Sequence, residues 1–265
     1  MNLTGKRVVL TRQAGKNQRL AAMLEERGAV PIEAPTIAIV DPPAWTEVDA
    51  SVRRLFAGEF EWVVFSSGNA VTRYCARLGC TPAAVFGKTK VAAVGSTTEQ
   101  VLREKGVEVD LVPGSYTAVD LALALGEGSG RVLMPRAQDV PAEMTNVLSE
   151  SGWTPEPVTV YRTETAEGSG PGAARVRAGD FDVVTLTSAS TVRGFAELFG
   201  APESLELHPS GGGSRSVVCI GPVTAAACEE LGFRIDAQAD PHTIEGLTSA
   251  LEGLPDERSA GEMAR

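Results

Sequence analysis

The feature that most constrains the fold of this chain is an internal repeat that covers most of the sequence. RVVLTR at residues 7–12 recurs as RVLMPR at residues 131–136. Three longer blocks recur in the same order at similar spacing: GEFEWVVFSSGNAV and GDFDVVTLTSASTV from 58 and 179, KVAAVGSTTEQVLREKGVEV and SVVCIGPVTAAACEELGFRI from 90 and 216, and YTAVDLALAL and HTIEGLTSAL from 116 and 242. Ordered self-similarity of this kind indicates an internal duplication.

Each copy alternates short β-rich runs with helical segments. VVLT, WVVFS, VAAV, VEVDLV and VLMP have the composition of strands that are buried on both faces. Segments such as QRLAAMLEERG, TTEQVLREKG and TAAACEELG carry apolar residues at helical spacing and end in glycine, a common helix stop. Alternation of this kind predicts parallel sheets with helices on both faces. The expected fold class is therefore α/β, with two flavodoxin-like parallel-sheet domains.

Length and charge limit the partners. A chain of 265 residues has room for two domains, and a formal net charge of −10 argues against nucleic acid and anionic membrane surfaces as partners. No apolar run reaches the length of a membrane span. Because MNLTGKRVVLTRQ enters a strand-like run without the apolar stretch of a signal peptide, we expect a cytoplasmic protein.

The sequence lacks the familiar cofactor and metal motifs. The cysteines and histidines are Cys75, Cys80, Cys219, Cys228, His208 and His242. They form no C-x-x-C pair and no zinc-type ligand set, and Cys219 and Cys228 are interpreted as small buried hydrophobic residues. No G-x-G-x-x-G opens a helix after a strand, and no phosphate-binding P-loop occurs. A response regulator would need acidic residues at its strand ends, where this sequence has Arg12 and Ser66, so that class of protein is excluded. We therefore expect no cofactor and no metal.

Small polar residues gather at the turns that follow the predicted strands. In open parallel sheets these turns form the ligand-binding edge, and helix N–H groups there suit carboxylates. The candidate substrate-binding residues at these turns are Ser66, Ser67, Asn69, Ser96, Thr97, Ser188, Ser190, Gly221 and Thr224. The alternative for each hydroxyl is helix capping, with a capping box from Ser96 to Glu99, while Pro222 suits a first helical position.

Two arginines occupy equivalent positions in the repeats. Arg12 and Arg136 each close a first strand, and they are candidate substrate-binding residues together with the turns. Lys16 and Arg193 are further cations near strand ends. The alternative for Arg12 and Arg136 is a solvated side chain or a structural ion pair.

The ordered motifs FSSGNAV, VAAVGSTT, TVYRT, TSASTV, IGPVTAAACEELG and PHTIEGLTSAL resemble the uroporphyrinogen-III synthase family, over residues 5–253. The resemblance implies two domains joined by a two-stranded β linker, with the first segments exchanged between the copies. Residues 7–35 would then pack with the second copy, and residues 36–40 and 158–163 would be the crossing strands. The expected domains are 1–36 with 165–254, and 37–164, followed by a disordered polar tail at 255–265.

The resemblance also implies an activity. Members cyclise hydroxymethylbilane, a linear tetrapyrrole with eight carboxylates, and invert its ring D through a spiro intermediate in the cleft between the domains. Tyr161 matches the family position that is proposed to assist departure of the hydroxyl, and its alternative is an aromatic anchor for the crossing strand. A transient handover from porphobilinogen deaminase is compatible with this role. The alternative functions are a non-catalytic tetrapyrrole-binding protein or a regulatory protein of the same fold.

Overall fold

The computed structural model describes residues 2–115, 117–207 and 215–255. The chain divides into two compact units, one of Met1–Ala38 with Glu164–Arg265 and one of Ile39–Thr163. The tail expected to be disordered lies outside the described residues, apart from Pro255.

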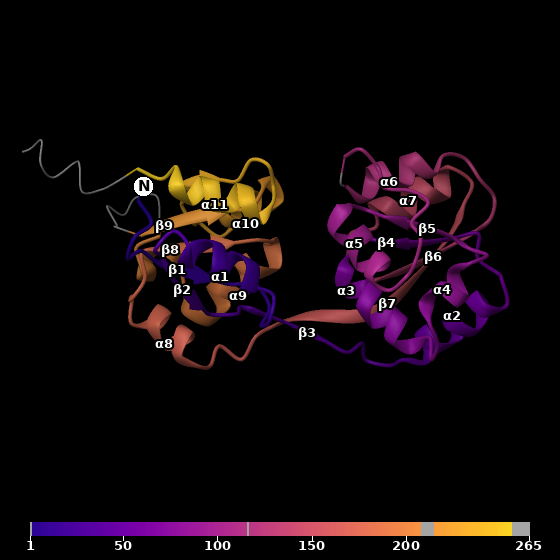
Figure 1. Cartoon of the computed structure of the whole chain (residues 1–265), viewed down its shortest axis with the longest axis horizontal. Helices are drawn as coiled ribbons and strands as arrows, with labels where there is room; N and C mark the ends of the chain where they lie inside the picture. The colour runs from indigo at the N-terminus through magenta and orange to yellow at the C-terminus, as the bar shows by residue number, and fades with distance from the viewer. Residues whose placement is uncertain (1, 116, 208–214, 256–265) are drawn as a thin grey trace, which may run out of the picture. The chain divides into compact units, whose positions relative to one another are not determined.

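Unit 1 is built on a five-stranded parallel sheet with the order β10-β9-β8-β1-β2 (Figure 1). Its strands are β1 (Arg7–Leu10), β2 (Val30–Glu33), β8 (Val183–Leu186), β9 (Ser216–Cys219) and β10 (Ala237–Gln238). In the unit's own chain order this is 2-1-3-4-5, the flavodoxin-like arrangement that the sequence predicts. Because β1 pairs with β8, the first segment of the chain belongs to the sheet of the second copy.

Helices cover both faces of the sheet in unit 1. They are α1 (Gln18–Glu25), α8 (Pro171–Arg177), α9 (Ala189–Phe199), the 3-10 helix η1 (Pro202–Leu205), α10 (Pro222–Glu230) and α11 (Ile244–Glu252). Val9 packs with α8, α9 and α10, whereas Val8 and Leu10 pack with α1 and α11. This alternation follows from the two-residue period of a strand. Cys219 and Cys228 are fully buried, which confirms their interpretation as small core residues.

Unit 2 has a second five-stranded sheet with the order β3-β7-β6-β4-β5, in which β7, β6, β4 and β5 correspond to β2, β1, β8 and β9 of unit 1 and β3 is added at the edge. Its strands are β3 (Ile37–Val40), β4 (Trp62–Phe65), β5 (Lys90–Ala93), β6 (Arg131–Ala137) and β7 (Thr154–Thr165). The pairings of β4, β5, β6 and β7 are parallel, and an isolated bridge joins Ala92 to Leu111. Because β6 pairs with β4, the block that starts the second copy completes the sheet of the first. The exchange of first segments is therefore confirmed.

The helices of unit 2 are α2 (Thr46–Phe56), α3 (Gly68–Arg77), α4 (Pro82–Phe86), α5 (Ser96–Glu104), α6 (Ala118–Leu125) and α7 (Glu143–Glu150). Helices α2 to α5 pack on the face that contains Val63 and Phe65. Helices α6 and α7 pack on the face that contains Val64 and Met134. The two faces are thus covered by separate groups of helices.

Two strands connect the units. The unit boundary falls after Ala38, inside β3, and after Thr163, inside β7, and these strands are neighbours in the sheet (Figure 1). The two-stranded linker is therefore present, with β7 longer than the crossing strand predicted at 158–163.

Candidate functional site

The turn between β4 and α3 carries the densest group of predicted site residues. All four residues of β4 are buried, so the strand is fixed, and the chain turns at Ser66. Ser67 is the N-cap of α3, in an extended conformation, and its Oγ accepts a hydrogen bond from the Ala70 amide at 3.2 Å. Ser66 and Asn69 flank it and are partly exposed. Ser67 therefore has the capping role that was its alternative interpretation.

Ser67 has a second contact that no local pattern predicts. The Tyr161 hydroxyl lies 3.1 Å from Ser67 Oγ and hydrogen bonds with it. Tyr161 lies in β7, next to a register shift where Ala137 pairs with Tyr161 although Arg136 pairs with Thr159. Such bulges re-aim side chains and are frequent near active sites. The phenol is thereby placed at the carboxyl edge of the sheet in unit 2, and its residue is only 8% exposed.

Arg136 is the second-last residue of β6 and lies at the same edge. Its Nη1 is buried and has no hydrogen-bond partner within residues 2–115, 117–207 and 215–255. Arg136 and Ser66 line a cavity of about 210 Å³ on the face covered by α6 and α7. A buried donor without a partner costs about 1–3 kcal/mol, and the described residues supply no acceptor for this nitrogen of the guanidinium.

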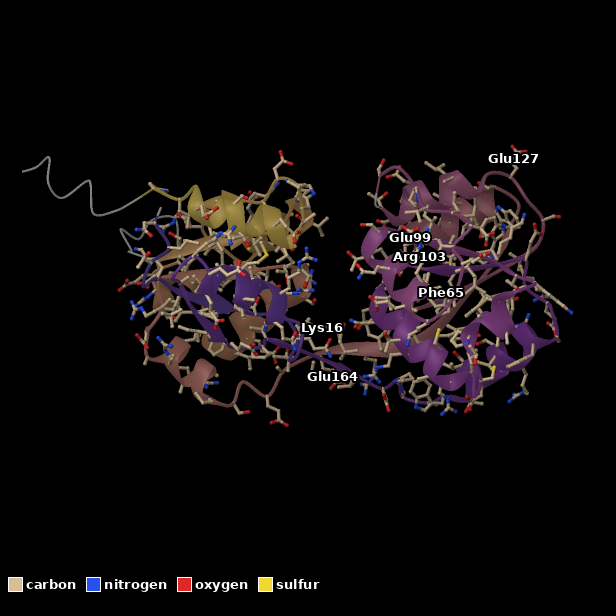
Figure 2. The ribbon with its side chains drawn as sticks, viewed as in Figure 1. Lys16, Phe65, Glu99, Arg103, Glu127 and Glu164 are labelled. Carbon is tan, nitrogen blue, oxygen red and sulfur yellow. The ribbon has the colours of Figure 1, made fainter. Side chains whose placement is uncertain are left out.

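The turn between β5 and α5 differs from its prediction. The N-cap of α5 is Gly95, in an extended conformation, and no side chain caps the helix. Ser96 is instead the first helical residue, and Glu99 accepts from Arg103 one turn later, where Figure 2 labels both side chains. The predicted capping box is therefore wrong. Ser96 and Thr97 are both exposed on the first turn of α5.

Unit 1 presents the equivalent turns with different chemistry. Ser188 caps α9 in a capping box with Thr191, and its Oγ lies 2.9 Å from Ser190 Oγ. Gly221 is the N-cap of α10 and Pro222 opens that helix, as predicted. Thr224 is buried, with 3% exposure, so its hydroxyl is withdrawn from solvent.

Arg12 follows β1 at the equivalent edge of unit 1. Its guanidinium donates to the Lys16 carbonyl at 2.8 Å, and partial burial lowers the pKa of Arg12 from its ordinary value. The side chain stays cationic, because arginine does not lose its proton in proteins. Among the described residues no carboxylate pairs with Arg12, which leaves the structural ion pair unsupported. Lys16, labelled in Figure 2, and Arg193 are exposed.

Sequence reasoning missed two helix caps that the repeat could have supplied. Thr117 caps α6 by accepting from the Asp120 amide, and Thr243 caps α11 by accepting from the Gly246 amide. They stand at matching positions of the last repeated block. Aligning YTAVD with HTIEG would have identified both, since threonine is a favoured N-cap.

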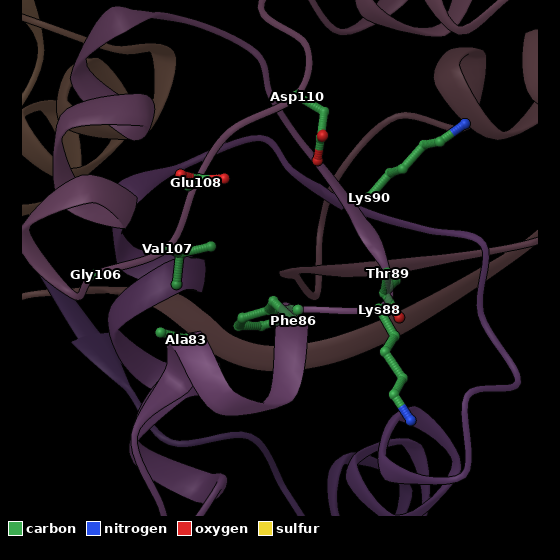
Figure 3. A pocket seen from close by; sticks show the side chains of 10 residues that line it. Ala83, Phe86, Lys88, Thr89, Lys90, Gly106, Val107, Glu108 and Asp110 are labelled. Atoms are coloured by element: carbon green, nitrogen blue, oxygen red, sulfur yellow. The ribbon is translucent and has the colours of Figure 1, made fainter.

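A second cavity lies at the opposite edge of unit 2. It has a volume of about 460 Å³ and is lined by residues at the start of β5, with Lys88, Lys90, Glu108 and Asp110 around it (Figure 3). Asp110 accepts from the Val91 amide there. Asp236 does the same for Val217 in unit 1, so this aspartate supports the strand in both copies. The cavity is separate from the carboxyl edge that carries Tyr161 and Arg136.

Within the described part of the chain no group of histidine, cysteine or acidic side chains could hold a metal ion. In the same residues no helix is long and apolar enough to cross a membrane.

The fold defines the class of protein: a duplicated, doubly wound α/β protein with exchanged first segments and with helix N-termini and hydroxyl residues at the carboxyl edges of its sheets. Comparison with known proteins makes this specific. The family model described as Uroporphyrinogen-III synthase HemD matches residues 18–249, so the chain belongs to the uroporphyrinogen-III synthase family. The resemblance drawn from the sequence motifs is thereby confirmed.

Individual relatives agree with the family. The chain is 29% identical over 255 residues to the uroporphyrinogen-III synthase of Synechococcus elongatus, covering 94% of this chain and 96% of that protein. A mutant uroporphyrinogen III synthase from Thermus thermophilus has a similar structure, with a TM-score of 0.64, 21% identity, and coverage of 97% and 100%. The enzyme from Helicobacter pylori 26695 gives a TM-score of 0.63 at 17% identity, with coverage of 94% and 99%. These two likenesses support the fold.

Proposed function

We propose that this chain is a uroporphyrinogen-III synthase that cyclises hydroxymethylbilane with inversion of ring D. The observation that carries the proposal is the family match, which spans both copies of the duplication. We propose that the site is a cleft between the two units, where the carboxyl edges of both sheets contact one substrate. The enzyme would be a cytoplasmic monomer that needs no cofactor or metal, and its net reaction, loss of water with ring closure, would make it a lyase.

The proposed chemistry is loss of a hydroxyl followed by carbon–carbon bond formation. The C–O bond of the hydroxymethyl group on ring A breaks, and the hydroxyl leaves as water after it gains a proton. The electrophilic azafulvene is then attacked by the substituted carbon of ring D, which gives a spiro intermediate. Fragmentation and reclosure turn ring D over, and loss of a proton restores the pyrrole. Because the free substrate also cyclises without inversion, the protein's main task is to hold the conformation in which spiro closure wins.

Tyr161 is the residue proposed to assist departure of the hydroxyl. A phenol is a hydrogen-bond donor and acceptor that stays neutral near pH 7, so it can donate to the leaving oxygen. Its contact with Ser67 Oγ supports this role, because that contact holds the phenol beside the α3 N-terminus. The substrate oxygen would replace or share the serine as hydrogen-bond partner.

The substrate carboxylates would be bound by local donors, since a protein of net charge −10 and an octa-anion repel each other at long range. Salt screens that repulsion beyond about 10 Å. The helix N-termini at Ser67, Gly95, Ser188 and Gly221 offer backbone N–H groups and a positive dipole end. Arg12 adds a cation in unit 1.

The test is a coupled assay with porphobilinogen deaminase, which generates hydroxymethylbilane in place. The porphyrinogen products are oxidised and separated into type I and type III isomers. We expect type III to dominate with this chain and type I to dominate in a blank that contains the deaminase alone. A type III yield no higher than in the blank would end the enzyme hypothesis.

A non-catalytic tetrapyrrole-binding or regulatory protein of the same fold is not favoured, because the relatives across the matched length are named as synthases.

Handover of the substrate from porphobilinogen deaminase is a further proposal. It predicts that the type III yield depends less on dilution than free diffusion of the intermediate would allow.

A further inference from the structure

The cavity that Arg136 lines, called here the Arg136 pocket, has a composition that suits a carboxylated ring. Its wall is mostly apolar, with Val64 and Met134 from the sheet, Ala118 from α6 and Met144 from α7. Only a few polar groups face it, among them the Ser66 turn, Arg136 and Glu143. Binding sites for small molecules typically combine an apolar lining with a few placed polar groups.

The polar groups have complementary roles. Arg136 Nη1 is a buried cationic donor with no partner in the described residues, so an anionic acceptor would complement it. Glu143 is an exposed acceptor in the first turn of α7. The Glu143 carboxylate would repel a carboxylate of the ligand but can accept a hydrogen bond from an N–H group. A ligand that fits both has a carboxylate at one end and an N–H donor elsewhere.

The volume limits how much of a ligand enters. About 210 Å³ is below the roughly 300–1,000 Å³ that encloses a whole drug-sized ligand. The pocket can therefore receive one ring with its arms and cannot receive a tetrapyrrole.

Position links the Arg136 pocket to the proposed reaction. Ser66 lines the pocket and Ser67, its neighbour, contacts the Tyr161 phenol. Arg136 stands at the register shift that brings Ala137 opposite Tyr161. The pocket and the phenol thus flank one turn at one edge of unit 2, from opposite faces of the sheet.

We propose that the Arg136 pocket is a subsite for one carboxylated pyrrole ring of the tetrapyrrole, with a carboxylate arm on Arg136 and the ring N–H on Glu143. This inference rests on the proposed function and names the part of the substrate that unit 2 takes in. When one ring is fixed in the pocket, the neighbouring part of the linear tetrapyrrole can reach Tyr161.

The experiment uses the full chain labelled with ¹³C at its methionine methyl groups. Of the five methionines, Met134 and Met144 line the pocket, while Met23 belongs to α1 in unit 1 and serves as an internal reference. The probe is porphobilinogen, a single pyrrole with one acetate arm and one propionate arm, and unsubstituted pyrrole is the control ligand. We expect porphobilinogen to shift the Met134 and Met144 signals in a saturable way and to leave Met23 unchanged, and pyrrole to shift none of them in the same range.

Variants test the role of the cation. Arg136→Gln should weaken porphobilinogen binding about tenfold or more, as expected for loss of a charged hydrogen bond. The matched control is Arg103→Gln, on the outer part of α5, whose partner is Glu99 and which should bind like the unaltered chain. Equal affinity of the Arg136 variant and the unaltered chain for porphobilinogen would overturn the assignment. Unshifted Met134 and Met144 signals in the unaltered chain would overturn it as well, and this second measurement does not depend on whether a variant folds.

The same preparation is assayed for type III product. Type III formation without shifts at Met134 and Met144 overturns the pocket assignment and leaves the proposed function standing. Saturable shifts without type III formation support the pocket as a site for carboxylated pyrroles and overturn the synthase function.

Discussion

Replacing Tyr161 by phenylalanine separates catalysis from anchoring, and the chain contains its own matched control. Tyr161 is a buried tyrosine whose hydroxyl lies 3.1 Å from Ser67 Oγ. Tyr74, also buried in unit 2, has its hydroxyl 3.2 Å from Ser51 Oγ in the core between α2 and α3. Tyr161→Phe and Tyr74→Phe therefore remove the same group and the same kind of hydrogen bond at two different places.

The expected magnitudes differ between stability and turnover. Each change removes a neutral hydrogen bond of about 0.5–1.5 kcal/mol. At roughly 2–4 °C per kcal/mol for a chain of this size class, both variants should melt within a few degrees of the unaltered protein. If the phenol assists departure of the hydroxyl, Tyr161→Phe should also lower turnover by about tenfold or more. Tenfold corresponds to about 1.4 kcal/mol of barrier.

The assay measures initial rates of type III formation from hydroxymethylbilane, alongside thermal melts of the same preparations. We expect a loss of turnover in Tyr161→Phe and a rate for Tyr74→Phe close to that of the unaltered chain. If turnover in Tyr161→Phe stays within about twofold of the unaltered chain, Tyr161 is an anchor for β7 and the catalytic assignment is refuted.

Three further predictions follow from individual contacts. Gly194→Ala places a methyl group against the Thr36 carbonyl oxygen, well inside van der Waals contact. The overpacking should cost an amount near the upper end of ~1–3 kcal/mol, which exceeds the ~1 kcal/mol gain in helix propensity, so the melting temperature should fall. Arg54 holds the pKa of Glu156 below its ordinary value; this stability is present above about pH 4 and is lost as pH falls through the folded-state pKa, so urea midpoints should drop between about pH 5 and pH 3. Arg12→Gln should raise the KM for hydroxymethylbilane about tenfold with little change in melting temperature, since no carboxylate among the described residues pairs with it.

Controls make these outcomes decisive. Gly253→Ala meets nothing closer than 3.5 Å and should not lower the melting temperature. Arg54→Gln should flatten the acid dependence of the urea midpoint, and an unchanged slope would show that the pair does not produce it. Arg103→Gln should leave the KM unaltered. A large loss of stability in Arg12→Gln would mean that Arg12 is structural.

Most of the fold could be predicted from the internal repeat. Strand composition and helix stops recur in both copies, so the parallel sheet of each unit follows from the local pattern and from the rule that successive parallel strands need a crossover connection. The exchange of first segments came from family resemblance alone. Nothing local distinguishes pairing of β1 with β8 from pairing with β4, because the competing strands have similar composition.

The site was predicted less completely, because its contacts join distant residues. The turn at Ser67 is local and was predicted, but its contact with Tyr161 spans 94 positions and depends on the register shift in β6 and β7. The capping box at Ser96 failed for a local reason. Gly95 adopts the extended conformation of the N-cap, so the helix begins at Ser96 itself, one residue earlier than a helix that Ser96 could cap.

The equivalent strands β1 and β6 place paired and unpaired arginines at opposite ends of the segments that contain them. Each repeated segment, RVVLTR and RVLMPR, begins and ends with arginine. The starting arginines are neutralised within the fold, Arg7 by Asp182 and Arg131 by Glu156. The closing arginines, Arg12 and Arg136, have no carboxylate partner among the described residues. The arginines at the amino edge are thus paired with carboxylates, and those at the carboxyl edge are not. The carboxyl edge therefore has cations without carboxylate partners, and the helix N-termini lie at the same edge. Net charge is therefore a poor guide to what this edge can bind, and the distribution of ion pairs along a single strand is a better one.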